Sequence, residues 1–145
     1  MGQTNPIFQF LESKGILIHL TEEQRRQISS FETIEKFIGK PDILAYNICL
    51  NTECVGFAML RKYSETDYFL WDYAIDSNFQ NKGYGTIALR QLIEFMKSRF
   101  HTKELTTTYL WGNDQAKHIY EKVGFIETDV VDEDGIHEVN MIKYL

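Results

Sequence analysis

The segment DSNFQNKGYGT, residues 76–86, joins the two elements of the chain whose patterns are plainest. An aromatic strand is expected before it, over residues 68–76, and an amphipathic helix after it, over residues 85–100. Its glycines, Gly83 and Gly85, can adopt positive φ and let the backbone approach a ligand closely. Amides that lead into a helix converge, and the helix dipole adds positive potential there. The segment therefore predicts a loop that binds phosphate; a plain turn with two glycines is the alternative.

Hydrophobic periodicity divides the rest of the chain into further elements. Thr21 and Gln24 spell a capping box for one helix that continues to residue 38, where Gly-Lys-Pro follows. Residues 8–14 are expected to be helical, and residues 15–20 to form a strand or buried connector. The remaining pattern predicts strands over residues 46–50, 54–61, 105–111, 125–131 and 136–145, and a helix over residues 114–123 that ends at Gly124. This order predicts a mixed α/β sheet in one domain, residues 1–145.

Composition narrows the classes of function. Fifteen basic and 21 acidic residues give a net charge of −6, which argues against a nucleic-acid-binding surface. No run of 18 apolar residues exists, and residues 1–6 lack the pattern of a secretion signal, so we expect no membrane span or export. Two cysteines suit a reducing cytoplasm, and four scattered histidines predict no metal site.

A second segment, WGNDQAKHIYEKVGF at residues 111–125, favours a ligand-binding loop over a plain turn at residues 76–86. Asn113-x-x-Ala116-x-x-x-Tyr120-x-x-x-Gly124-Phe, together with Gln80-x-x-Gly83-x-Gly85, resembles the GNAT superfamily of N-acetyltransferases at each defining position of its two motifs. The resemblance covers roughly two thirds of the chain, from Cys54 onward. Within the superfamily, residues 70–85 are most similar to small spermidine/diamine-type acetyltransferases.

The resemblance implies a fold, a co-substrate and a set of contacts. The fold is the acyl-CoA N-acyltransferase fold, a mixed, partly splayed α/β sheet of six to seven strands flanked by helices. The co-substrate is acetyl-CoA, whose pyrophosphate is expected on loop amides and whose pantetheine arm is expected beside the preceding strand, in the manner of an added strand. The cofactor-binding residues implied are Tyr73, Ala74, Ile75, Gln80, Asn81, Lys82, Gly83, Tyr84, Gly85, Thr86 and Asn113.

Tyr120 aligns with the tyrosine that protonates the departing CoA thiolate in the family. A phenol with a pKa near 10 stays protonated at neutral pH, which suits a proton donor. The alternative is a core tyrosine, because Tyr120 lies on the apolar stripe of its helix.

The acceptor is expected to be a primary amine, and a polyamine or other small cationic amine is favoured. Asp72 is predicted as a catalytic base and as a substrate-binding carboxylate, because some polyamine-acetylating relatives carry an acidic residue there. Trp71, Glu32 and Glu35 are the other predicted substrate-binding residues, with an ordinary solvated role as the alternative for the carboxylates. The alternatives for the function are acetylation of a peptide or an aminoglycoside-type acceptor, or a non-catalytic CoA-binding sensor. Association of two copies of the chain as a homodimer is a further alternative.

Overall fold

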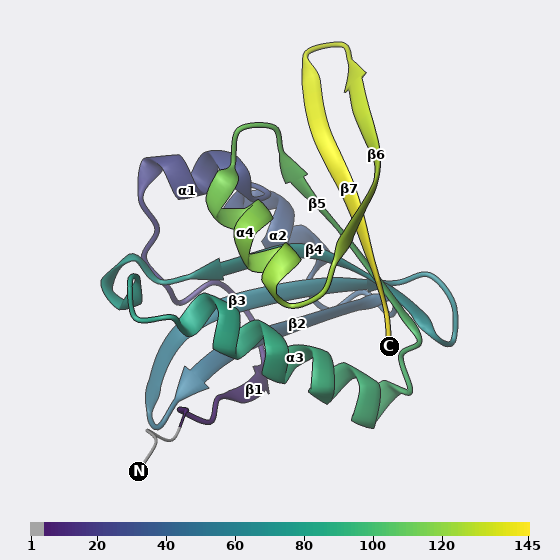
Figure 1. Cartoon of the computed structure of the whole chain (residues 1–145). Helices are drawn as coiled ribbons and strands as arrows, with labels where there is room; N and C mark the ends of the chain where they lie inside the picture. The colour runs from purple at the N-terminus through teal and green to yellow at the C-terminus, as the bar shows by residue number, and fades with distance from the viewer. Residues whose placement is uncertain (1–4) are drawn as a thin grey trace.

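A seven-stranded sheet forms the centre of the computed structural model, which describes residues 5–145 (Figure 1). Residues 1–4, part of the stretch that was expected to carry no secretion signal, lie outside this range. The strand order is β1-β2-β3-β4-β5-β7-β6, and β4–β5 is the parallel pair among antiparallel neighbours. The strands are β1 (Gln9–Glu12), β2 (Ile43–Leu50), β3 (Glu53–Lys62), β4 (Asp67–Ile75), β5 (Glu104–Leu110), β6 (Ile126–Glu133) and β7 (Ile136–Tyr144). The predicted mixed α/β class is confirmed.

Helices cover both faces of this sheet. The helices are α1 (Glu22–Gln27), α2 (Phe31–Phe37), α3 (Tyr84–Phe100) and α4 (Asp114–Lys122), with a short 3₁₀ turn η1 (Ser77–Phe79) before α3. The apolar stripe of α3, which includes Leu89, Leu92 and Met96, packs in one core with Tyr120 of α4. Ile34 of α2 packs in a second core, on the other face of the sheet. Figure 1 shows α3 and α4 in front of the sheet and α1 and α2 behind it. No helix within residues 5–145 is long and apolar enough to cross a membrane.

Two expectations for the amino-terminal part were wrong. The single helix expected to run from Thr21 to residue 38 is divided into α1 and α2, because Ile28 is extended and Ser30 caps a new helix by accepting from the backbone N–H of Thr33. The capping box of Thr21 and Gln24 is confirmed as the start of α1. Residues 8–14 contain strand β1 in place of a helix, because this segment pairs along the edge of β2, with Phe10 opposite Ile48.

A β-bulge in β4 determines which side chains reach each face of the sheet. Met59 of β3 lies opposite Asp72 and the next residue, Leu60, lies opposite Leu70, so Trp71 is an extra residue. Leu70 packs on the α3 side, whereas Trp71 packs on the α2 side. The bulge interrupts the alternation of a strand, in which successive side chains point to opposite faces. As a result Asp72 also faces the α1–α2 side.

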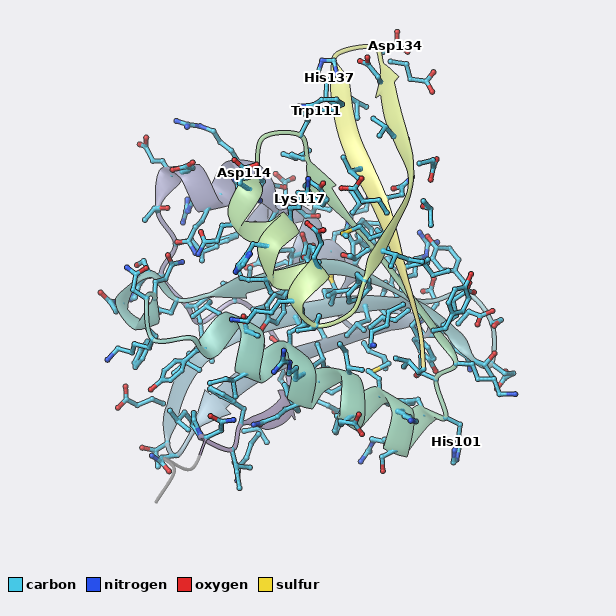
Figure 2. The ribbon with its side chains drawn as sticks, viewed as in Figure 1. His101, Trp111, Asp114, Lys117, Asp134 and His137 are labelled. Carbon is cyan, nitrogen blue, oxygen red and sulfur yellow. The ribbon has the colours of Figure 1, made fainter. Side chains whose placement is uncertain are left out.

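The β6–β7 hairpin extends beyond the rest of the sheet. Figure 2 shows Asp134 and His137 near its far end, with Trp111 beside them and Asp114 and Lys117 on the neighbouring α4. Its turn is made by Asp134 and Gly135, both with positive φ.

Candidate active site

The candidate site is a cavity of about 230 Å³ beside β4, at the point where the sheet opens. Strands β4 and β5 pair over four positions only, from Asp67–Glu104 to Leu70–Thr107, and then separate. The cavity is lined by β4 residues beyond this point, by the loop after η1, by the start of α3, by the end of β5, and by faces of α1 and α4. The parallel pairing therefore brings both sequence segments identified above to one place.

The predicted phosphate loop has the geometry of an anion site. Gly83 adopts the left-handed region with φ 78° and is the residue before α3, which begins without a side-chain cap. The first amides of a helix have no partner within the helix. Tyr84, Gly85 and Thr86 supply these amides and line the cavity. Asn81 also has positive φ, 62°, and lines the cavity.

Two other loop residues lie differently from the expectation. Gly85 is inside α3 with ordinary helical backbone, and its lack of a side chain admits α4, because a Cβ there would lie 3.1 Å from Ile119 Cδ1. Lys82 is exposed and is not part of the cavity lining. The structure therefore groups the loop amides around the cavity without the predicted cation.

The last carbonyl of β4 holds two glutamine side chains at the cavity. Gln80 Nε2 donates to the Ile75 oxygen over 3.2 Å, and Gln24 Nε2 donates to the same oxygen over 2.9 Å. Gln24 Oε1 accepts from the Thr21 backbone N–H, so this side chain also closes the capping box of α1. These contacts fasten α1 to the strand on which the pantetheine arm is expected.

Tyr73 joins β4 to the start of α3. Its hydroxyl donates to the Gly85 carbonyl over 2.7 Å, and burial raises the pKa of the phenol well above its ordinary value. Tyr73, Ala74 and Ile75 all line the cavity. The contact fixes the distance between the predicted pantetheine strand and the predicted pyrophosphate amides.

Helix α4 presents Tyr120 to the cavity. Asn113 caps this helix by accepting from the Ala116 backbone N–H over 3.2 Å, and Gly124 follows its end with φ 106°. Tyr120 is buried, contacts Phe125 edge to face at 5.6 Å between ring centroids, and lines the cavity. Burial raises the pKa of Tyr120 to about 12; a hydrogen bond with the Thr107 side chain lowers it and the Asp72 carboxylate raises it. The phenol is therefore protonated throughout the neutral range.

Asp72 lines the cavity from the α1–α2 side. It is 3% exposed, and its Oδ1 accepts from the Ser29 backbone N–H over 2.8 Å. Its Oδ2 is buried and has no hydrogen-bond partner among the described residues. Burial raises the pKa of this carboxyl, and the hydrogen bonds from Ser29 oppose that effect. Buried polar atoms are normally paired, so the free oxygen marks a place where a donor is missing.

Of the other predicted substrate-binding residues, one lines the cavity and two lie outside it. Trp71 lines the cavity, and its ring packs edge to face on Phe37 at 4.8 Å between centroids. Glu32 and Glu35 are exposed on α2 and are not part of the lining. The structure does not bring these two carboxylates to Asp72, because Ile34, between them, is the residue that α2 buries.

Some lining residues were not predicted from the sequence. Gln24, Gln27 and Ile28 come from α1 and its end, and Thr108 and Tyr109 come from β5. The capping box indicated where α1 begins, but no local signal indicates that α1 covers β4. No group of three or more His, Cys, Asp or Glu residues within residues 5–145 is placed to hold a metal ion.

Comparison with known proteins agrees with this geometry. The model of the acetyltransferase (GNAT) family matches residues 12–125. An uncharacterized N-acetyltransferase, ycf52 of Pyropia yezoensis, is 30% identical over 86 residues, which are 59% of this chain and 45% of that protein. The chain thus spans less than half the length of the curated relatives it matches.

Two solved structures share the fold at low sequence identity. A GNAT family acetyltransferase from Elizabethkingia anophelis, with acetyl-CoA bound, has a TM-score of 0.74 at 20% identity, over 99% of this chain and 100% of that one. The spermidine N-acetyltransferase of Vibrio cholerae, in complex with CoA and spermine, has a TM-score of 0.69 at 16% identity, over 80% and 76%. Since the family model spans most of its length, this chain belongs to the acetyltransferase (GNAT) family.

Proposed function

We propose that this protein is an acetyl-CoA-dependent N-acetyltransferase that acetylates a primary amine by direct attack in a ternary complex. The observation that carries the proposal is the cavity where β4 and β5 separate, because it joins unpaired backbone groups, a buried phenol and a buried carboxylate. Membership of the family supports it, as do the CoA-bound structures that share the fold.

The backbone on one side of the cavity is suited to acetyl-CoA. The amides of Tyr84, Gly85 and Thr86 would receive the pyrophosphate, since anions bind at helix N-termini. The edge of β4 beyond Leu70 lacks its neighbour β5, and it would pair with the amides of the pantetheine arm. Gln80 and Asn113 lie at the border of this region and complete the predicted contacts.

The transfer uses Asp72 and Tyr120 in different steps. Asp72 receives the ammonium and takes one proton from it, and its raised pKa makes it a stronger base than a solvated carboxylate. The free amine forms a C–N bond to the thioester carbon, and a backbone N–H of β4 stabilises the oxyanion of the resulting tetrahedral intermediate. The C–S bond then breaks, and Tyr120 protonates the leaving sulfur. Tyr120 regains a proton from the nitrogen, so one proton ends on the thiol and one goes to solvent.

The proton transfer from Tyr120 is coupled to bond cleavage. With a pKa of about 12 this phenol is a weaker acid than an ordinary thiol, whose pKa is near 8.5. We therefore expect the proton to move as the C–S bond breaks, beside the buried Tyr120 phenol, where the developing thiolate would be poorly solvated.

A thiol-release assay tests the proposal. The protein is incubated with acetyl-CoA and a panel of primary amines, and free CoA and acetylated product are measured together. Equal amounts of CoA and acetylated amine support the proposal. A CoA-binding sensor would instead bind acetyl-CoA in a thermal-shift experiment and release no thiol with any amine or peptide, which would overturn it.

A further inference from the structure

We propose that the acceptor is a monoamine: a single ammonium group on an uncharged, largely apolar body, rather than a polyamine or an amino acid. This inference rests on the proposed function, because it names the acceptor of that transfer. The juxtaposition that carries it is one buried, half-paired carboxylate in a cavity whose other lining side chains are neutral.

The charge content of the cavity is the first observation. Within the described chain, Asp72 is the single charged side chain among the lining residues. The carboxylates that would serve a second ammonium, Glu32 and Glu35, are exposed on α2 outside the cavity. Lys82, the cation of the loop, is also outside it. The lining side chains therefore offer a counter-charge to one positive group and to no negative group, and the loop amides are assigned to the pyrophosphate of acetyl-CoA.

The state of Asp72 is the second observation. The Ser29 backbone N–H donates a hydrogen bond to Oδ1 over 2.8 Å, whereas Oδ2 is buried and has no hydrogen-bond partner among the described residues. An ammonium bound there would supply the missing donor and would neutralise the charge. A buried charge is costly unless it is paired and hydrogen-bonded, so one ammonium satisfies this site and a second one would be left unpaired.

The surroundings of Asp72 indicate the body of the acceptor. Trp71, the preceding residue, lines the cavity, and Ile28 and Gln27 line it from the end of α1. The aromatic face of Trp71 attracts a cation and also packs against hydrocarbon. Trp71 and Ile28 favour an alkyl or arylalkyl chain next to the ammonium, and the Gln27 amide adds no charge.

Polyamines and amino acids each carry a group that this lining does not accept. The second ammonium of a polyamine would lose water without gaining a carboxylate. The carboxylate of an amino acid would lie near Asp72 with no lining cation to offset the repulsion. The polyamine favoured from the sequence rested on Asp72, with Glu32 and Glu35 as further negative charge, and these two carboxylates do not line the cavity.

Three amines with the same six-carbon chain test the inference. Hexylamine, 1,6-diaminohexane and 6-aminohexanoate differ only in a far end that is a methyl, an ammonium or a carboxylate. We expect kcat/KM for hexylamine to exceed that of the other two by about tenfold or more, since the extra charge must be desolvated unpaired. Spermidine and a short neutral peptide with a free amino terminus complete the panel. A diamine, spermidine, amino acid or peptide that equals or exceeds hexylamine would overturn the inference.

A gain-of-function variant and a binding measurement separate this inference from the proposed function. Gln27→Glu adds a second carboxylate to the lining, and it should improve the ratio of diamine to hexylamine kcat/KM by about tenfold. If that ratio does not move, the charge argument is wrong. If no amine is acetylated, the proposed function fails, and calorimetric titration of the CoA complex with the same three amines still decides the inference. Preferential binding of hexylamine supports it, and equal, weaker or absent binding overturns it.

Discussion

The backbone N–H of Ser29 donates to Asp72 Oδ1 over 2.8 Å, and this contact ties the α1–α2 linker to the middle of β4. The carboxylate so held is 3% exposed and keeps its other oxygen unpaired. A group in this state costs stability in the free protein, because a buried charge is only partly compensated.

Asp72→Asn should stabilise the protein at neutral pH by about 1 kcal/mol, or about 3 °C in Tm. Burial raises the pKa of Asp72 in the folded state above that of an unfolded aspartate, near 3.9. As pH rises through the interval between these two values, the unfolded state ionises first, so the wild type loses stability; above the folded-state pKa the loss is complete. Below about pH 3 the carboxyl is protonated in both states, and the two proteins should converge. Thermal melts of both proteins from acid to neutral pH measure this, and a variant less stable than wild type at neutral pH would show that Asp72 is paired.

The same substitution should raise the acceptor KM about tenfold and leave acetyl-CoA affinity nearly unchanged. An ammonium 4 Å from a carboxylate gains about 4 kcal/mol at an effective dielectric of 20, and desolvation removes much of this. Glu32→Gln and Glu35→Gln are the matched controls, since each removes a carboxylate outside the cavity. Steady-state kinetics with the best amine, at two ionic strengths, give the comparison. Equal KM values for Asp72→Asn and wild type would make Asp72 an ordinary structural carboxylate.

Tyr120→Phe should lower kcat by about 10²- to 10⁴-fold while acetyl-CoA affinity stays nearly the same. The change keeps the ring that packs on Phe125 and removes only the proton donor. Tyr46→Phe is the control, because Tyr46 is equally buried but does not line the cavity. Since the pKa of Tyr120 is about 12, the wild type should keep its donor protonated through mildly alkaline pH. Unchanged turnover in a variant that binds acetyl-CoA would leave Tyr120 with a packing role alone.

Gly83→Val should abolish the stabilisation that acetyl-CoA gives to the fold. A ligand in hundredfold excess over its Kd stabilises a protein by about 2.7 kcal/mol, which a thermal-shift experiment detects. Gly83 has φ 78°, a region that costs a side-chain-bearing residue about 1–2 kcal/mol, and its relaxation would displace the loop amides.

Gly135→Val is a closely matched control for that strain. Gly135 has φ 76° and nothing within 4 Å of an added Cβ, and at Gly83 the nearest atom, Ile87 Cδ1, is 3.9 Å from that position, so neither site is crowded; Gly135 lies in the β6–β7 turn, away from the cavity lining. The control should lose comparable stability and keep the full acetyl-CoA shift. Loss of the shift in both variants, or in neither, would contradict the pyrophosphate assignment.

The order of elements could be predicted from the sequence because most of them carry a local signal. The stripe of α3, the cap and closing glycine of α4, and the capping box of α1 are each set by neighbouring residues. The loop at Gly83 was found for the same reason, since positive φ favours glycine wherever the chain requires it. Local interactions thus account for the part of the site that faces the proposed co-substrate.

The acceptor side of the site could not be predicted in the same way. At the break between α1 and α2, next to the local cap at Ser30, Ser29 contacts Asp72, 43 residues away in the chain. Gln24 reaches the Ile75 carbonyl over 51 residues, and the sequence gives no sign of that pairing. Glu32 and Glu35 were expected to add negative charge near the acceptor, with a solvated helix face as the alternative. Both are exposed on α2, which buries Ile34 instead.

The extra residue at Trp71 makes this site depend on how β4 pairs with β3. If β4 kept its length but paired without the bulge, strict alternation would return and every later side chain of the strand would move to the opposite face. The carboxylate of Asp72 would then point toward α3, and the hydroxyl of Tyr73 would leave the Gly85 carbonyl for the α1–α2 side. Both halves of the cavity would be lost although neither residue had been changed. Libraries for altered acceptor preference should therefore keep the bulge while they vary residue identity. Deletion of Trp71 alone should leave Asp72 and Tyr73 on their present faces, because it removes the extra residue and keeps the pairing on both sides of it.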